Sequence, residues 1–134
     1  MAAVALPRPL VNQLLHQAQA KPQQEICGLI GARNGLPFRC YPMNNIAPEP
    51  QRHFLMDPQG QIAAMRRMRE EGEELFGIYH SHPETAPLPS KSDLAQAAYP
   101  GVLYLIISLN TKGVLEMRGF RLQGEVYEEI ELQL

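Results

Sequence analysis

The chain has 134 residues, a length typical of one domain, so we expect a single domain over residues 1–134. Apolar residues make up 45% of the sequence and charged residues 19%, which excludes a disordered chain. The net charge of −2 excludes the basic footprint of a nucleic-acid binder. No apolar run approaches the roughly 20 residues that cross a bilayer, and the N-terminus lacks the basic flank of a signal peptide. We therefore expect a cytoplasmic protein that binds neither nucleic acid nor membrane.

The pattern of apolar residues, glycines and prolines predicts an alternation of helices and short strands. In chain order we expect a helix over 9–20, strands over 26–32 and 36–43, a loop over 44–51, a strand over 52–56, a helix over 58–71, a strand over 75–80, a loop over 81–91, a helix over 92–98, a strand over 102–109, a turn over 110–113, and strands over 114–122 and 125–132.

Local signals support several of these elements. Asn34-Gly35 is typical of a tight hairpin turn, and the prolines of the returning strand favour a sheet edge. Asp57 followed by Pro58 predicts a helix N-cap and first turn. In that helix Ile62, Met65 and Met68 are expected to face inward, and in the last strand Val126, Ile130 and Leu132 share one face.

Together these elements predict a mixed α/β fold with a central, largely antiparallel β-sheet flanked by helices. The strands after residue 113 carry no chemical motif, and they are free either to extend the sheet or to form the edge of a homodimer. Cys27 and Cys40 belong to no CxxC pair, so we expect free thiols and a metal site made of histidine and carboxylate.

The strongest chemical signal is the sequence His80-Ser81-His82-Pro83, followed after ten intervening residues by Asp93. In an extended strand residues i and i+2 point to the same side, so the two imidazoles can reach one point. The proline-rich loop after His82 can bring Asp93 back to that point. Two nitrogens and one carboxylate oxygen leave the fourth position of a tetrahedral zinc open for water, as in catalytic sites.

A hydrolase of this kind also needs a proton carrier, and Glu25 at the junction of the first helix and first strand is our candidate. Ser90 is a candidate hydrogen-bond donor to the oxyanion of the tetrahedral intermediate. Structural interpretations compete with these roles. Ser90 and Asp93 form an S-x-x-D capping box, and a capping role competes with metal binding by Asp93. Glu25 taken alone is an ordinary solvated carboxylate, and Cys27 a small buried side chain. His16 and His53 have no partner pattern and are interpreted as surface or structural residues.

Taken together, these residues resemble the JAMM/MPN+ (Mov34/MPN/PAD-1) zinc metallopeptidases, of the compact bacterial stand-alone type. The resemblance rests on Glu25, on the H-S-H-P sequence from His80 to Pro83, and on Ser90-Lys91-Ser92-Asp93, and it extends over residues 10–109. It implies a cytidine-deaminase-like architecture and one zinc ion per chain. It also implies that His80, His82 and Asp93 are the ligands, Glu25 the general acid and base, and Ser90 the oxyanion support.

The resemblance also implies a substrate class. Compact bacterial members are similar in acting on ubiquitin-like, β-grasp sulfur-carrier proteins, from which they remove a cysteine or a short extension after the C-terminal Gly-Gly. Two alternatives stay open at this point. In the first, the chain is a non-catalytic zinc-containing MPN module that docks a carrier protein. In the second, it is a cysteine hydrolase that uses Cys27 with a histidine.

Overall fold

A computed structural model describes residues 3–99, 101–110 and 115–134. The elements in chain order are β1 (Val4–Ala5), α1 (Arg8–Ala20), β2 (Cys27–Arg33), β3 (Leu36–Met43), α2 (Pro58–Glu70), β4 (Glu74–His82), α3 (Lys91–Gln96), β5 (Leu103–Ser108), β6 (Glu116–Gln123), β7 (Val126–Ile130) and β8 (Leu132–Gln133). Most of the turn predicted at 110–113, and residue 114 at the start of the next predicted strand, lie outside the described residues.

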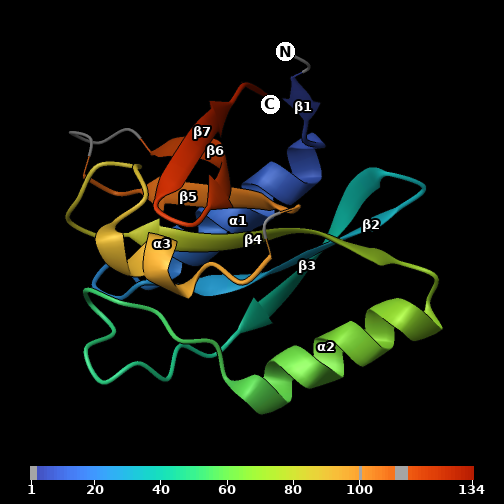
Figure 1. Cartoon of the computed structure of the whole chain (residues 1–134), viewed down its shortest axis with the longest axis horizontal. Coiled ribbons are helices and arrows are strands. Elements are labelled where there is room, and N and C mark those ends of the chain that lie inside the picture. Colours follow the sequence, from blue (N-terminus) through green and yellow to red (C-terminus); the bar gives the residue numbers. More distant parts are fainter. Residues whose placement is uncertain (1–2, 100, 111–114) are drawn as a thin grey trace.

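Six strands form the central sheet, in the order β3-β2-β4-β5-β6-β7 (Figure 1). All neighbours in this sheet are antiparallel except β4 and β5, which are parallel. Near the termini β1 and β8 form a separate parallel pair. The predicted mixed α/β class with a largely antiparallel sheet is therefore confirmed.

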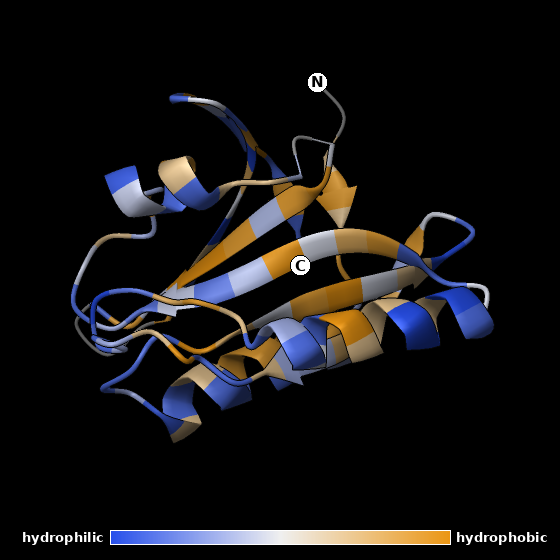
Figure 2. Ribbon diagram, turned by 60° about the horizontal axis from the view of Figure 1, so that its bottom comes forward, coloured by the Kyte–Doolittle hydropathy of each residue, from blue (hydrophilic) through white to orange (hydrophobic). Residues whose placement is uncertain are grey.

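The core lies on both faces of this sheet. Alternate residues of β5 point to opposite faces, so Leu105 packs with α1 whereas Ile106 packs with α2. Figure 1 shows α1 behind the sheet and α3 in front of it, and the hydropathy colours of Figure 2 follow the buried strands. His80 and His82 follow Ile78 in β4 at alternate positions, so all three side chains point to the same face of the sheet. This is the face that α2 covers.

The local signals of the first half are confirmed. Asn34 and Gly35 both have positive φ, 54° and 77°, as a tight hairpin turn with the right twist requires. β3 is one of the two edge strands of the central sheet, as its prolines predicted. Asp57 caps α2, because its Oδ1 accepts a hydrogen bond of 3.2 Å from the backbone N–H of Gln59.

Three expectations were wrong. Residues 52–56 form no strand, and only one isolated bridge joins Asn45 to Met56. Ile62 is 61% exposed, because the buried stripe of α2 is narrow and centres on Ala64 and Met68. The predicted strand 125–132 breaks after residue 130. Ile130 reaches the core, whereas Val126 is exposed. Leu132 lies in β8, which pairs with β1.

The sheet register explains how the site assembles. Cys27 of β2 pairs with His80 of β4, so extending the antiparallel register by two residues places Glu25 beside His82. Because β4 and β5 are parallel, the chain between them must cross over the sheet. That crossover contains α3 and carries Asp93 back to the end of β4.

Candidate metal centre

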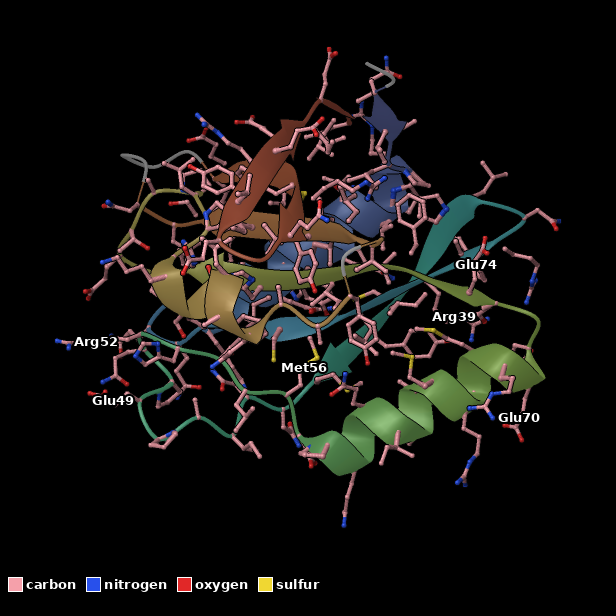
Figure 3. All side chains as sticks on the ribbon, viewed as in Figure 1. Arg39, Glu49, Arg52, Met56, Glu70 and Glu74 are labelled. Atoms are coloured by element: carbon pink, nitrogen blue, oxygen red, sulfur yellow. The ribbon has the colours of Figure 1, made fainter. Side chains whose placement is uncertain are left out.

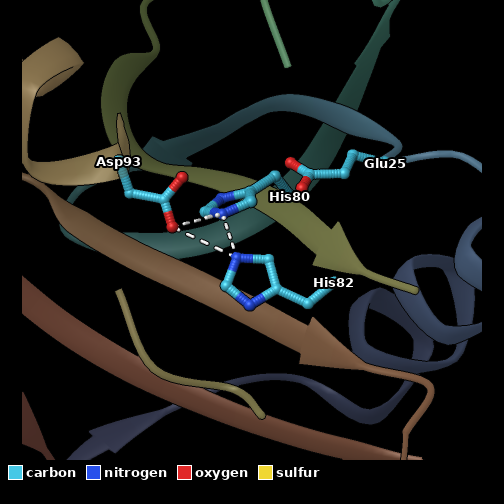
Figure 4. Close-up of side chains that lie close together, drawn as sticks. All are labelled: Glu25, His80, His82 and Asp93. Atoms are coloured by element: carbon cyan, nitrogen blue, oxygen red, sulfur yellow. Dashed lines mark hydrogen bonds and ion pairs between the residues drawn. The ribbon is translucent and has the colours of Figure 1, made fainter. Parts of the chain in front are cut away.

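Four buried side chains converge at the C-terminal end of β4: Glu25, His80, His82 and Asp93 (Figure 4). The Nε2 atoms of His80 and His82 each lie 3.1 Å from Oδ2 of Asp93, and they lie 3.0 Å from each other. One carboxylate oxygen of Glu25 completes a group whose ligand atoms all lie within 4.8 Å. Each of the four residues is at most 7% exposed. The site is thus a small, dry cluster of nitrogen and oxygen atoms.

The orientation of each histidine ring is fixed from outside the cluster. Nδ1 of His82 lies 2.8 Å from the backbone carbonyl of Ala86, which only accepts hydrogen bonds, so Nδ1 carries a proton and the ring is held with Nε2 toward Asp93. The ring of Phe54 stacks on His80 with centroids 4.4 Å apart and planes inclined by 24°. Nδ1 of His80 is buried and has no hydrogen-bond partner among the described residues.

Asp93 has two roles that were expected to compete. Its Oδ2 accepts a hydrogen bond of 2.9 Å from the backbone N–H of Ser90, and Ser90 Oγ accepts one of 3.0 Å from the N–H of Asp93. The predicted capping box of α3 is therefore confirmed. The same Oδ2 also faces both histidine rings. Cap and ligand position do not exclude each other, because the cap turns the carboxylate toward the cluster.

Glu25 is held through its backbone. Its N–H donates to the carbonyl of Pro50 (2.7 Å), and its own carbonyl accepts from Nδ2 of Asn45 (2.9 Å). On the other side Ser81 clamps the residues flanking Glu25: its Oγ accepts from the N–H of Ile26 (2.9 Å) and donates to the carbonyl of Gln24 (3.4 Å). This clamp gives the middle residue of the His-Ser-His sequence a physical role.

The carboxylate of Glu25 is set up to bind a proton. Its Oε1 is buried without a hydrogen-bond partner in the part of the chain that the structure describes. Burial, opposed by His82 and reinforced by the charge of Asp93, raises the pKa of Glu25 from 4.5 to about 7. A carboxyl group with a pKa near neutrality both takes up and returns a proton at physiological pH.

The donor atoms of the cluster suit a cation. An ionised carboxylate only accepts hydrogen bonds, and the Nε2 atoms of both histidines face its Oδ2. Burial alone would lower the pKa of His82, but hydrogen bonds to Asp93 and Ala86 outweigh it and raise that pKa, so metal binding at Nε2 would release a proton. Burial alone would raise the pKa of Asp93, but the two histidines and the Ser90 N–H outweigh it and hold that pKa well below its ordinary value. Burial also lowers the pKa of His80 and favours the neutral ring, which is the form that binds metals. Two imidazoles with one carboxylate are the donor set of a three-ligand catalytic zinc site, so the residues fit zinc.

The structure brings together four of the five residues predicted for the site, and the fifth, Ser90, lies next to them through its cap with Asp93.

Cys27 is 1% exposed, and burial, followed by the charge of Glu25, raises the pKa of its thiol to about 12. A protonated, buried thiol is a poor nucleophile. His16 and His53 are exposed and do not belong to the cluster.

Sequence reasoning did not find three residues that support the site: Asn45, Phe54 and Ser108. Asn45 stands in a segment interpreted only as a loop, and nothing in the local sequence marks Phe54 as the partner of His80. Ser108 Oγ donates to the carbonyl of Thr85 (2.7 Å) and holds the loop after β4. Asparagine side chains often hydrogen-bond the backbone in loops, and the place of Asn45 between two predicted elements was the only sequence signal for its role.

A cavity of about 350 Å³ adjoins the site, and Phe54 forms part of its wall. It lies between α2, the residues after α3, and strands β4 and β5. Its lining is largely apolar and consists of Phe54, Leu55, Met56, Gln61, Ile78, Gln96, Ala98, Tyr99 and Tyr104.

Fold and site together define a metallohydrolase whose metal-binding residues sit at the end of a central strand. The chain belongs to the family described as prokaryotic homologues of the JAB domain, a branch of the JAMM (MPN) proteins, whose model matches residues 7–122. The predicted family and enzyme class, a JAMM-type metallopeptidase, are thereby confirmed.

Individual relatives agree with this assignment. The chain is 33% identical over 93 residues to a desampylase of Haloferax volcanii, which covers 68% of this chain and 67% of the relative. It is 32% identical over 123 residues to the CysO-cysteine peptidase of Mycobacterium tuberculosis, covering 90% of this chain and 84% of the relative. A solution structure of a protein from Desulfitobacterium hafniense shares the fold with a TM-score of 0.86 and 35% identity, covering 98% and 92% of the two chains.

Within the described residues, every helix is too short or too polar to span a membrane.

Proposed function

We propose that the chain is a zinc peptidase that hydrolyses the amide bond after the C-terminal Gly-Gly of a ubiquitin-like sulfur-carrier protein, releasing cysteine or a short extension. The observation that carries this proposal is the convergence of three candidate metal-binding atoms, 3.0–3.1 Å apart, beside a buried glutamate. One oxygen of that glutamate has no hydrogen-bond partner in the part of the chain that the structure describes. In this proposal His80, His82 and Asp93 hold one zinc ion per chain.

A zinc ion in this position would polarise the scissile carbonyl and lower the pKa of the attacking water to about 7. The protein then supplies proton transfer and charge stabilisation. Glu25 takes the proton from the water and returns it to the leaving nitrogen, a double role favoured by the burial that raises its pKa to about 7 in the metal-free chain. Ser90 uses its Oγ lone pair for the cap and keeps its hydroxyl hydrogen free to bond the developing oxyanion.

The depth of the site supports a Gly-Gly substrate. All four central side chains are at most 7% exposed, so the scissile bond must reach them on a thin, extended segment. Glycine has no side chain and permits such a close approach of backbone to the site. The CysO-cysteine peptidase, which matches most of this chain, is by its name a peptidase for a cysteine adduct, and this supports cysteine as a leaving group.

Two further statements belong to the same proposal. Residues 1–134 form one JAMM/MPN domain, because β7 continues the central sheet and β8 returns to pair with β1 beyond the matched segment. The homodimer expected from the sequence stays a prediction, with the exposed β7 edge as its candidate contact.

The test is a mass-spectrometric cleavage assay on zinc-loaded protein with a Gly-Gly-terminated carrier that bears a C-terminal cysteine or a short peptide. We expect the extension to be lost, with cleavage abolished by a chelator and by Glu25→Gln. A carrier that binds but keeps its mass, with zinc present, would favour the non-catalytic docking module. Turnover that resists chelation and stops on thiol alkylation would favour Cys27 as nucleophile.

A further inference from the structure

The side chain of Asn45 makes four hydrogen bonds, which is its full capacity. Its Nδ2 donates to the carbonyls of Glu25 (2.9 Å) and His53 (2.9 Å). Its Oδ1 accepts from the N–H groups of Ala47 (3.0 Å) and Leu55 (3.0 Å). Both donor contacts end on carbonyls and both acceptor contacts on amides, so the orientation of the amide group is unambiguous.

These four bonds join two parts of the site that are distant in sequence. One bond reaches the backbone of Glu25, the proposed proton carrier. Two others hold the carbonyl of His53 and the N–H of Leu55, on either side of Phe54, whose ring stacks on the metal-site residue His80. The outer bend of this segment, with Glu49 and Arg52, projects away from the core (Figure 3), and its carbonyl at Pro50 accepts the N–H of Glu25.

Glu25 depends on such backbone anchors. Its Oε1 is buried and has no hydrogen-bond partner among residues 3–99, 101–110 and 115–134, so these residues do not fix that oxygen through hydrogen bonds. The position of the carboxylate therefore follows from the backbone, which is held at its N–H by Pro50 and at its carbonyl by Asn45. Of these two bonds, only the one from Asn45 comes from a side chain and is open to substitution.

We propose that Asn45 is a positioning residue for the hydrolysis: it sets the place of Glu25 and, through Phe54, that of His80. This inference rests on the proposed function, because the effect is exerted on its proton carrier. Asn45 lies in the loop between β3 and α2 and reaches the site only through other residues. Its loss is therefore expected to slow the chemical step without removing a metal ligand.

The decisive variant is Asn45→Asp. It keeps the shape and the acceptor oxygen that bonds Ala47 and Leu55, but it loses both donors and turns an oxygen toward the carbonyl of Glu25. With zinc-loaded protein and the carrier substrate we expect kcat to fall by about 10- to 100-fold, zinc content to stay at the wild-type level, and KM to change by less than about twofold. The matched control is Asn44→Asp, the same change at the exposed neighbouring position, which we expect to leave kcat unchanged.

A double-mutant cycle separates positioning from general support of the fold. In a Glu25→Gln background the proton-transferring carboxylate is already absent, so only the part of the effect that acts through Phe54 and His80 remains. Asn45→Asp should therefore lower the residual rate by clearly less than it lowers the wild-type rate. The same 10- to 100-fold loss in both backgrounds would overturn the proposal. So would a wild-type kcat for Asn45→Asp. If that variant does not fold, Asn45→Ser, which keeps one donor without adding a charge, takes its place in the cycle.

A crystal structure keeps this inference distinguishable from the proposed function. If the wild-type protein cleaves no carrier, the proposed function fails, yet the placement can still be measured. We expect the carboxylate of Glu25 to be displaced or disordered in Asn45→Asp and unchanged in Asn44→Asp. A Glu25 carboxylate in its wild-type place in both variants would refute the role of Asn45 whatever the substrate.

Discussion

Replacing Glu25 by glutamine tests two consequences of the same burial. Glutamine has the shape of glutamate without its charge, and Glu25 is only 5% exposed. Its Oε1 has no hydrogen-bond partner within the described residues, so the change leaves no partner of that oxygen unpaired. The three proposed zinc ligands, His80, His82 and Asp93, are untouched, and we expect Glu25→Gln to retain zinc as the wild type does.

The first consequence concerns stability in the metal-free protein. Burial raises the pKa of Glu25 from 4.5 to about 7, so the folded state binds this proton more tightly than the unfolded state does. Stability from this group is therefore present below pH 4.5 and is lost as the pH rises toward 7. The difference corresponds to about 3 kcal/mol at most, reduced by whatever solvent reaches the carboxylate.

Glutamine does not titrate, so the stability of the variant relative to the wild type should increase as the pH rises. Denaturant unfolding of both metal-free proteins at pH 4.5 and pH 8 measures this increase in relative stability, which we expect to be about 1–3 kcal/mol. A difference between the two proteins that does not change with pH would refute the reasoning from burial.

The second consequence concerns turnover. Removing the proton carrier should lower kcat by about 10²- to 10⁴-fold, or about 3–5 kcal/mol in the barrier. The assay is the release of the extension from the carrier, followed by mass spectrometry at matched zinc content. Turnover of Glu25→Gln at the wild-type rate would refute the role assigned to Glu25.

Three more predictions follow from the same geometry. His80→Ala and Asp93→Ala should each lose zinc on dialysis, as measured by metal analysis, and unchanged zinc in both would show that the ligand set is wrong. Ser90→Ala should keep zinc, lower kcat by about 10²-fold and destabilise the fold by about 1 kcal/mol through the lost cap. The control Ser92→Ala should change neither kcat nor stability. A Ser90→Ala enzyme with normal kcat would leave Ser90 as a helix cap alone. Cys27 should resist alkylation in the folded protein, because its thiol is 1% exposed and its pKa is raised to about 12, and rapid labelling with loss of activity would contradict this.

Much of the fold follows from short-range signals. Asn34-Gly35 fixed a hairpin because both residues adopt positive φ at little cost. Asp57 and Pro58 marked the start of α2 because cap and first-turn preferences depend on neighbouring backbone alone. The sequence likewise named the candidate ligands, since His80 and His82 at i and i+2 in a strand must share a face.

Other features depend on what lies opposite each segment in space. The apolar residue Ile62 is exposed because the sheet meets α2 along a narrower stripe than the sequence pattern suggested. Residues 52–56 have strand composition but form only one described bridge, and the side chain of Asn45 bonds the segment at His53 and Leu55. No local pattern carries that information.

The chemistry divides in the same way. The amino-acid sequence by itself determined which side chains are present and, through their spacing, that a zinc-binding group was possible. Only the tertiary structure decided that Oδ2 of Asp93 serves cap and cluster at once, and that Glu25 is dry enough for a pKa of about 7. The physical reason is that hydrogen-bond geometry and desolvation depend on atoms brought together by the strand register and the crossover, over distances that local sequence does not encode.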